Sequence, residues 1–216
     1  EIGADVGIGF DADGDRVGFI DETGSLVPPD DIILLLSKDT LSRHPGKKIL
    51  FDVKCTQLLS DMIPDFGGVP SMHRTGHAPI KDTLRKDSEI IFGGETSGHF
   101  YFVEDYFRID DGFYAAASVL QLFAKQQTPF SSLFGFIPKR VRTHEIKLPC
   151  DDKVKFNIVD AIRKEFSKKY KCIFIDGVRV VFDESSWGLV RASNTSPYLT
   201  IKVEALTDDK VIEIKN

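Results

Sequence analysis

Three aspartates lie close together near the start of the chain, where their side chains could bind a divalent metal ion. Asp11, Asp13 and Asp15 alternate with small residues, and Arg16 follows directly. Carboxylates crowded in this way repel one another, and a cation between them relieves that repulsion. Their oxygens suit Mg²⁺, Mn²⁺ or Ca²⁺, and a guanidinium beside the ion suits a phosphate held between the two. The stretch therefore predicts a divalent metal site that handles phosphate.

Two other interpretations of this stretch stay open. Asp and Gly are common turn residues, so the aspartates could form only a solvated acidic turn. A calcium loop of the EF-hand type is the sharper alternative, because Glu22 stands where its closing carboxylate belongs. Against it, Arg16 occupies the position at which that loop requires glycine, and the flanking residues indicate strands. We favour the phosphate-handling metal site over both alternatives.

Regular elements must position these aspartates. Apolar runs at 6–10 and 17–20 predict a buried strand that enters the turn and a strand that returns from it. Downstream, strands are expected at 48–53, 69–74 and 89–92, and helices at 28–42, 56–63 and 78–86. This alternation is typical of βαβ units, and it predicts an α/β domain with a doubly wound, largely parallel, mixed sheet.

Polar motifs follow the ends of these predicted strands, where ligands bind in doubly wound sheets. Lys54 lies in a strand-to-helix turn and could serve an anionic substrate or a proton transfer. His77 stands at a helix start, where backbone N–H groups favour anions. Glu95, Ser97 and His99 alternate in a glycine-rich turn and suit the hydroxyls of a sugar. Taken singly, each residue also fits an ordinary surface turn, so their common location is what indicates a site.

A second, smaller α+β unit is predicted to begin near Pro138. Before it, a helix opened by Asp110 and Asp111 is expected to run to residue 123, with a structural apolar face. Within the smaller unit, a helix is expected at 152–169 and strands at 143–148, near 173, and at 178–182, 188–191 and 198–204. The domains are therefore placed at 1–25, 26–138 and 139–216.

One loop of the smaller unit has the composition of a phosphate site. It combines a guanidinium, hydroxyls and an amide without any acidic group: Arg191, Ser193, Asn194, Thr195 and Ser196. Such a loop can enclose a phosphate dianion through charge-assisted bonds and backbone N–H groups. An ordinary polar hairpin loop is the alternative.

Composition excludes several classes of protein. The net charge of -5 argues against a nucleic-acid partner. Three cysteines without a CxxC pair indicate neither a disulfide framework nor a zinc ribbon, which fits the cytoplasm. No long apolar segment or signal peptide is present, so no membrane partner is expected. The chain opens on Glu1, Ile2 and Gly3 and soon enters a strand, so we expect it to be a piece of a longer protein.

The motifs at 11–16, 52–56, 75–77, 94–99 and 191–195 together resemble the α-D-phosphohexomutases, and most of all their bacterial phosphomannomutase/phosphoglucomutase branch. The resemblance runs the length of the chain. It implies a mutase that interconverts hexose 1-phosphate and hexose 6-phosphate through a phosphoserine enzyme and a hexose 1,6-bisphosphate intermediate. Phosphoryl transfer needs mostly positioning and charge neutralisation, which these residue types provide.

The resemblance also implies a role for each motif. Mg²⁺ would be held by Asp11, Asp13 and Asp15, with a phosphoserine oxygen as a further ligand. The reaction centre would be lined by Arg16, Lys54 and His77. Sugar hydroxyls would be bound by Glu95 and Ser97, with His99 close by. The phosphate that is not transferred would be bound by Arg191, Ser193, Asn194, Thr195 and Ser196.

The sequence departs from the family in one respect. The family carries its nucleophilic phosphoserine in a Thr-Ala-Ser-His-Asn-Pro type of loop upstream of the metal loop, and no such loop occurs here. We therefore expect the chain to correspond to the third and fourth family domains and the tail of the second. It would be inactive alone, with hexose phosphates, the bisphosphate and the missing N-terminal domains as its partners. The alternative is a non-catalytic sugar-phosphate-binding module.

Overall fold

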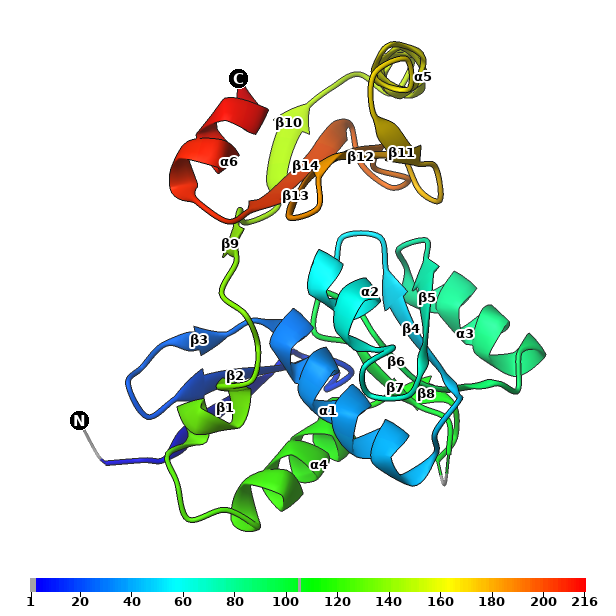
Figure 1. The fold of residues 1–216 in the computed structure, drawn as a ribbon. Coiled ribbons are helices and arrows are strands. Elements are labelled where there is room, and N and C mark those ends of the chain that lie inside the picture. The colour runs from blue at the N-terminus through cyan, green and yellow to red at the C-terminus, as the bar shows by residue number, and fades with distance from the viewer. Residues whose placement is uncertain (1–2, 105) are drawn as a thin grey trace. The chain divides into compact units, whose positions relative to one another are not determined.

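The chain divides into two compact units, Glu1–Pro138 and Lys139–Asn216. Figure 1 shows the computed structural model, which describes residues 3–104 and 106–216. Glu1 and Ile2, on which the expectation of a longer protein partly depends, lie outside the described residues. Within those described ranges, no helix combines the length and the apolar character needed to cross a bilayer.

The first unit begins with a three-stranded antiparallel sheet around the aspartates. It consists of β1 (Val6–Phe10), β2 (Val17–Asp21) and β3 (Leu26–Val27) in that order. β2 places two side chains in the core, with Val17 at 3 % and Phe19 at 1 % exposure. The prediction that the entering strand is buried is wrong, because β1 is the edge strand and is half exposed.

A mixed sheet forms the centre of the first unit. Its strand order is β5 (Val69–His73), β4 (Lys48–Asp52), β6 (Ile90–Gly94), β7 (Phe100–Phe102) and β8 (Ile109–Asp110). β4 pairs in parallel with β5 and β6, whereas β7 and β8 are antiparallel. The predicted α/β fold with a mixed sheet is confirmed, and β3 and β8 are short strands that sequence patterns did not predict.

Helices cover both faces of this sheet. They are α1 (Pro29–Arg43), α2 (Gln57–Met62), α3 (His77–Lys86) and α4 (Gly112–Ala124). Because side chains alternate along a strand, Ile49 and Phe51 of β4 point to one face and Leu50 to the other. The first face packs on α1, α2 and α4, and the second on α3 (Figure 1). Loops at the carboxyl ends of β4 and β6 are thereby fixed between two layers of helices.

The glycine pair after residue 92 extends β6 instead of ending it. Gly93 pairs with Tyr101 and Gly94 with Phe100 in the antiparallel ladder to β7. A Cβ atom at Gly94 would lie 2.5 Å from Ile33 Cγ1 of α1. Gly94 therefore allows a helix to pack directly on a strand, a role that turn statistics do not reveal.

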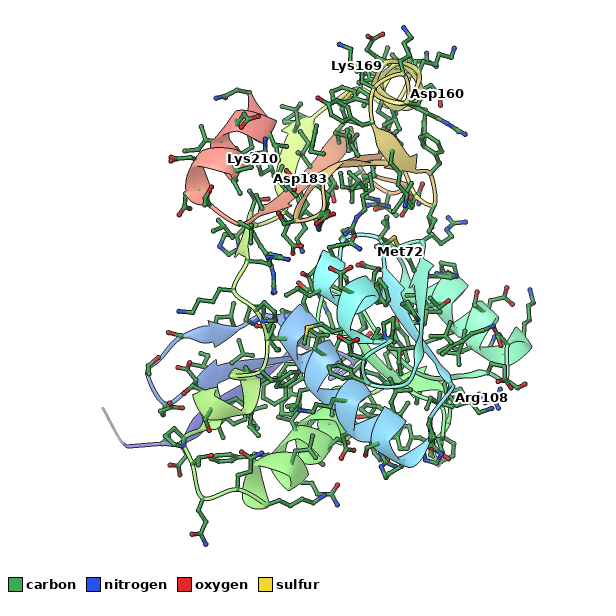
Figure 2. The ribbon with its side chains drawn as sticks, in the orientation of Figure 1. Met72, Arg108, Asp160, Lys169, Asp183 and Lys210 are labelled. Atoms are coloured by element: carbon green, nitrogen blue, oxygen red, sulfur yellow. The ribbon has the colours of Figure 1, made fainter. Side chains whose placement is uncertain are left out.

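The second unit is an antiparallel sheet with two helices on one face (Figure 1). The strands are β9 (Val141–Arg142), β10 (Ile146–Pro149), β11 (Lys171–Ile173), β12 (Val178–Asp183), β13 (Ser186–Ala192) and β14 (Tyr198–Ala205). The helices are α5 (Lys155–Phe166) and α6 (Asp208–Lys215). The turn between β12 and β13 is closed by Asp183, labelled in Figure 2, whose carboxylate accepts bonds from Ser185 and Ser186. α5 is shorter at both ends than the predicted 152–169. At its start, Asp151 accepts the N–H of Lys153 at 2.8 Å in a separate turn, and at its end residues 167–169 form a turn.

Backbone hydrogen bonds fasten the aspartate turn to the central sheet and to α4. The N–H of Val17 donates to the carbonyl of Gly98 at 3.2 Å, and the N–H of Gly112 donates to that of Gly14 at 3.0 Å. The ring of Phe10 stacks on Phe113, with the two centroids 4.3 Å apart. The turn is therefore part of the first unit's packing.

Replacement of Gly112 by alanine is expected to loosen this attachment. A Cβ atom there would lie 2.8 Å from the carbonyl oxygens of both Gly14 and Arg16, which are backbone atoms. We expect a loss of about 1–3 kcal/mol in the free energy of unfolding, measured by urea denaturation. Gly9→Ala is the control, because its Cβ would meet no atom within 4 Å. Equal losses in the two variants would contradict the steric argument.

Candidate functional site

The three aspartates form a compact carboxylate cluster. Oxygens of Asp11, Asp13 and Asp15 lie within 4.8 Å of one another. Arg16 donates to Asp11 twice, from Nε at 2.5 Å and from its backbone N–H at 3.2 Å. Oδ1 of Asp15 is buried and makes no hydrogen bond within the described part of the chain. Hard oxygen donors with one buried oxygen unbonded fit Mg²⁺, and these residues could hold that ion.

The calcium-loop alternative does not fit the fold. Glu22 accepts the backbone N–H of Ser131 at 3.0 Å and the Ser131 hydroxyl at 2.5 Å. Ser131 belongs to the 3₁₀ helix η1 (Phe130–Phe134), so Glu22 is engaged there and does not close a loop around the aspartates. The flanking elements are strands, whereas an EF-hand loop lies between helices.

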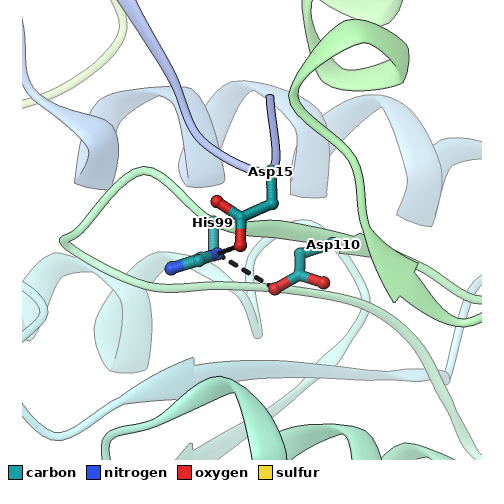
Figure 3. Close-up of side chains that lie close together, drawn as sticks. All are labelled: Asp15, His99 and Asp110. Atoms are coloured by element: carbon teal, nitrogen blue, oxygen red, sulfur yellow. Dashed lines mark ion pairs between the residues drawn. The ribbon is translucent and has the colours of Figure 1, made fainter. Parts of the chain in front are cut away.

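His99 joins the aspartate cluster to the central sheet, as Figure 3 shows. Its Nδ1 atom lies 3.0 Å from Asp110 Oδ2 and 3.8 Å from Asp15 Oδ2. Lys81 of α3 pairs with the other oxygen of Asp110 at 2.5 Å. Sequence reasoning missed Asp110 and Lys81 as members of the site. Asp110 was interpreted only as part of a helix start, and a lysine on an exposed helix carries no signal of its own.

Charge around His99 favours its protonated form. Burial lowers the pKa of His99, but the close contact with the Asp110 carboxylate and the nearby carboxylates of Glu95 and Asp15 outweigh it and raise that pKa. Burial raises the pKa of Asp110, but His99 and Lys81 lower it to about 2. Burial raises the pKa of Asp15, with a further contribution from the neighbouring aspartates. The site thus places an imidazole whose protonated form is favoured beside an ionised carboxylate.

Glu95 lies beneath a tight turn that also carries Ser97. It is buried, at 2 % exposure, and its two oxygens accept the N–H of Gly76 at 2.9 Å and the Tyr101 hydroxyl at 2.6 Å. Burial and the Glu95 charge raise the pKa of Tyr101, which keeps its hydroxyl as a donor. The Ser97 side chain is exposed at the tip of the turn. The sugar-binding roles of Glu95 and Ser97 stay predictions.

Lys54 lies in the turn between β4 and α2, and His77 lies in the 75–77 turn at the start of α3. The His77 ring is exposed and stacks on His99, with centroids 6.0 Å apart and an interplanar angle of 10°. Lys54 is buried, and its Nζ lies 3.7 Å from Asp52 Oδ2. Together with the Glu95–Gly76 bond, these contacts connect the aspartate cluster, the 75–77 turn and the 95–99 turn within the first unit.

The 191–196 loop belongs to the second unit and is shaped by its own contacts. Arg191 Nε donates to Asp176 Oδ2 at 3.1 Å. The Ser193 hydroxyl oxygen accepts the backbone N–H groups of Ser196 at 3.2 Å and Thr195 at 3.4 Å. Lys155 also supports this loop, since its Nζ donates to the Ser196 carbonyl at 3.1 Å.

Two features of that loop bear on phosphate binding. The side chains of Asn194 and Thr195 are exposed, and the contact with Asp176 occupies Nε of Arg191. Asp176 and Lys155 were missed from the sequence, because each lies in a different element from the loop. The phosphate-binding role of the loop stays a prediction.

Comparisons with known proteins agree on one family. The model described as "Phosphoglucomutase/phosphomannomutase, alpha/beta/alpha domain III" matches residues 28–140, and the model for the C-terminal domain matches 145–216. A phosphomannomutase/phosphoglucomutase from Pseudomonas putida is 42% identical over 217 residues, which cover 100% of this chain and 46% of that protein. The chain therefore spans about half the length of the curated relatives it matches.

Solved structures show the same likeness. A phosphoglucomutase/phosphomannomutase family protein from Burkholderia thailandensis superimposes with a TM-score of 0.90 at 34% identity, covering 98% of this chain and 45% of that one. An N-acetylphosphoglucosamine mutase from Aspergillus fumigatus, solved in complex with GlcNAc-6P and magnesium, has a TM-score of 0.64 at 11% identity. It covers 96% of this chain and 46% of that chain, and at this identity it shows a shared fold alone.

Asp110→Asn is expected to lower the pKa of His99. In the wild type the raised pKa adds stability that is fully present below the unfolded-state value of about 6.5 and is lost as pH rises through the folded-state pKa. Without the Asp110 carboxylate, only Glu95 and Asp15 oppose the effect of burial, so the ring loses its proton at lower pH. NMR titration of the His99 ring in metal-free buffer measures this. Asp82→Asn, an exposed carboxylate paired with Lys86, is the control, and an unchanged His99 titration in Asp110→Asn would contradict the network.

Proposed function

Since the chain belongs to the phosphoglucomutase/phosphomannomutase family, we propose that it is part of an enzyme that interconverts hexose 1-phosphate and hexose 6-phosphate. The observation that carries the proposal is the position of His99. Its Nδ1 lies 3.8 Å from Asp15 of the carboxylate cluster, and its ring stacks on His77. A cation site and a group able to hold a proton are therefore neighbours, which phosphoryl transfer between hydroxyl groups requires.

Each part of the site takes a distinct task in this proposal. Mg²⁺, when bound by Asp11, Asp13 and Asp15, supplies charge neutralisation for the phosphoryl group. Arg16 lies beside it and binds phosphate oxygens. His99, His77 and Lys54 hold or move the proton of the attacking or leaving hydroxyl.

Substrate recognition is divided between the two units in this proposal. Glu95 and Ser97 bind sugar hydroxyls, and the 191–196 loop binds the phosphate that is not transferred. Arg191 is suited to this task because Asp176 engages only its Nε atom among the contacts described above, and a guanidinium has further donors. Ser193 supports the loop, because its hydroxyl oxygen accepts the backbone N–H groups of Thr195 and Ser196.

The nucleophilic serine is proposed to lie on a part of the enzyme that this chain does not contain, because the chain has no Thr-Ala-Ser-His-Asn-Pro loop. The chain alone would then bind hexose phosphates without turning them over, and the N-terminal domains would be its partner. The proposed location is the cytoplasm, which suits three cysteines that form no disulfide.

Mg²⁺ binding tests the metal site. In calorimetry we expect the wild type to bind Mg²⁺, and then glucose 1,6-bisphosphate more tightly in its presence. Asp13→Ala is expected to weaken Mg²⁺ binding at least about tenfold, because a hard ion loses a charged ligand. Asp5→Ala, an exposed aspartate outside the cluster, is the control. Binding of the sugar phosphate without any response to Mg²⁺ would favour a non-catalytic module. Turnover of glucose 1-phosphate by this chain alone would contradict the proposal that the nucleophile lies on another part of the enzyme.

Arg191→Met tests the phosphate loop. Loss of a charge-assisted donor to a phosphate is expected to weaken binding of hexose phosphates by about tenfold or more. Lys169→Met removes an exposed positive charge from the same unit, labelled in Figure 2, and is the control for net charge. If the two variants lose affinity equally, Arg191 acts only through the overall charge. If neither loses affinity, Arg191 does not bind the phosphate.

A further inference from the structure

Asp52 is a buried carboxylate that contacts two of the turns described above. It ends β4 with 0 % exposure. Its Oδ1 accepts the backbone N–H of Lys54 at 3.1 Å and the thiol of Cys55 at 3.2 Å. Its Oδ2 accepts the Thr75 hydroxyl at 3.5 Å and lies 3.7 Å from Lys54 Nζ. One carboxylate therefore touches the Lys54 turn and the 75–77 turn.

Burial of this charge is not explained by the packing of the strand. The three preceding residues of β4, Ile49, Leu50 and Phe51, are apolar and equally buried. Burying an ionised carboxylate costs free energy unless charged and hydrogen-bonding partners compensate for it. An apolar side chain would fill the end of the strand without that cost. We therefore expect the charge of Asp52 to position the residues that it contacts.

We propose that Asp52 is a positioning residue for the substrate site, which holds the Lys54 ammonium and the 75–77 turn in fixed relation. This inference rests on the proposed function, because it assumes that Lys54 meets the substrate. Two other buried carboxylates support the same turns from different sides. Asp30 of α1 accepts the N–H of Thr56 at 3.1 Å, and Glu95 accepts that of Gly76 at 2.9 Å. Asp52 contacts both turns and adds the contact with the Lys54 ammonium.

A substitution that removes only the charge separates positioning from packing. Asp52→Asn keeps an oxygen able to accept the Lys54 N–H but loses the negative charge that faces Nζ. We expect its affinity for glucose 1,6-bisphosphate, measured by calorimetry with Mg²⁺ present, to fall about tenfold. In a Lys54→Met background the same substitution should have no further effect, because Asp52 acts through the lysine.

The fold offers a matched control for this charge. Asp87 has the same local arrangement at the opposite end of β4, where its Oδ1 accepts the N–H of Glu89 at 3.0 Å and its Oδ2 pairs with Lys48 Nζ at 2.8 Å. Asp87→Asn should leave the affinity unchanged. Equal losses from Asp52→Asn with and without Lys54, or equal losses in the Asp52 and Asp87 variants, would overturn the proposal.

A measurement without ligand keeps the test independent of the proposed function. Hydrogen exchange of the Lys54 and Gly76 amides should be at least about tenfold faster in Asp52→Ala, which removes both accepting oxygens, than in the wild type, with the helices unchanged. Thr75→Val, a milder change that removes one donor to Asp52, should accelerate exchange in the 75–77 turn alone. If exchange at both turns is unaltered, Asp52 does not hold them. If the wild type binds no hexose phosphate while exchange responds, the proposed function fails and the positioning role stands.

Discussion

The balance of buried negative charge is the constraint on which the first unit depends. Asp52, Glu95 and Asp110 are nearly or fully buried at the ends of strands or beside them. Ionised carboxylates in such positions cost several kcal/mol of desolvation unless donors and cations surround them. Each of these carboxylates therefore contacts donors or cations of another element; Asp110, for example, pairs with Lys81 of α3. Movement of one loop would leave a charge unpaired, so the loops are held as a set.

At Asp15 the negative charge is not fully compensated by hydrogen-bond donors or cations. Its Oδ1 is buried and without a hydrogen bond in the described residues, and burial together with the other aspartates raises its pKa. Arg16 is drawn toward Asp11, which it contacts at 2.5 Å, and lies farther from Asp15, at 3.7 Å. Negative charge is thus left over at one point of the cluster. A divalent cation bound there would neutralise that charge, so the metal proposal has an electrostatic argument beside the one from the family.

Sequence patterns could predict the features that depend on residues close together along the chain. Alternating strand and helix patterns placed the mixed sheet, and the motifs then fell at strand ends. What they could not predict depends on partners distant in the sequence. Lys81 and Asp110 have ordinary neighbours and meet only because α3 and β8 lie beside the same turn. Gly94 was assigned to a turn because its real constraint, contact with Ile33 of α1, arises from packing.

The two units stabilise their proposed binding loops by different physical means. In the first unit, charged side chains such as Asp52 and Glu95 hold the turns, so ionisation and structure are coupled. In the second, the Ser193 hydroxyl and the Lys155 ammonium fix the 191–196 loop through backbone groups. This arrangement suits the proposed binding of a dianion, because the carboxylate of Asp176 contacts Nε of Arg191 and the loop itself carries no acidic residue. In the proposed function, the two units therefore meet opposite charge requirements: crowded carboxylates of the first unit would support cation binding, and a loop of the second unit without carboxylates would support anion binding.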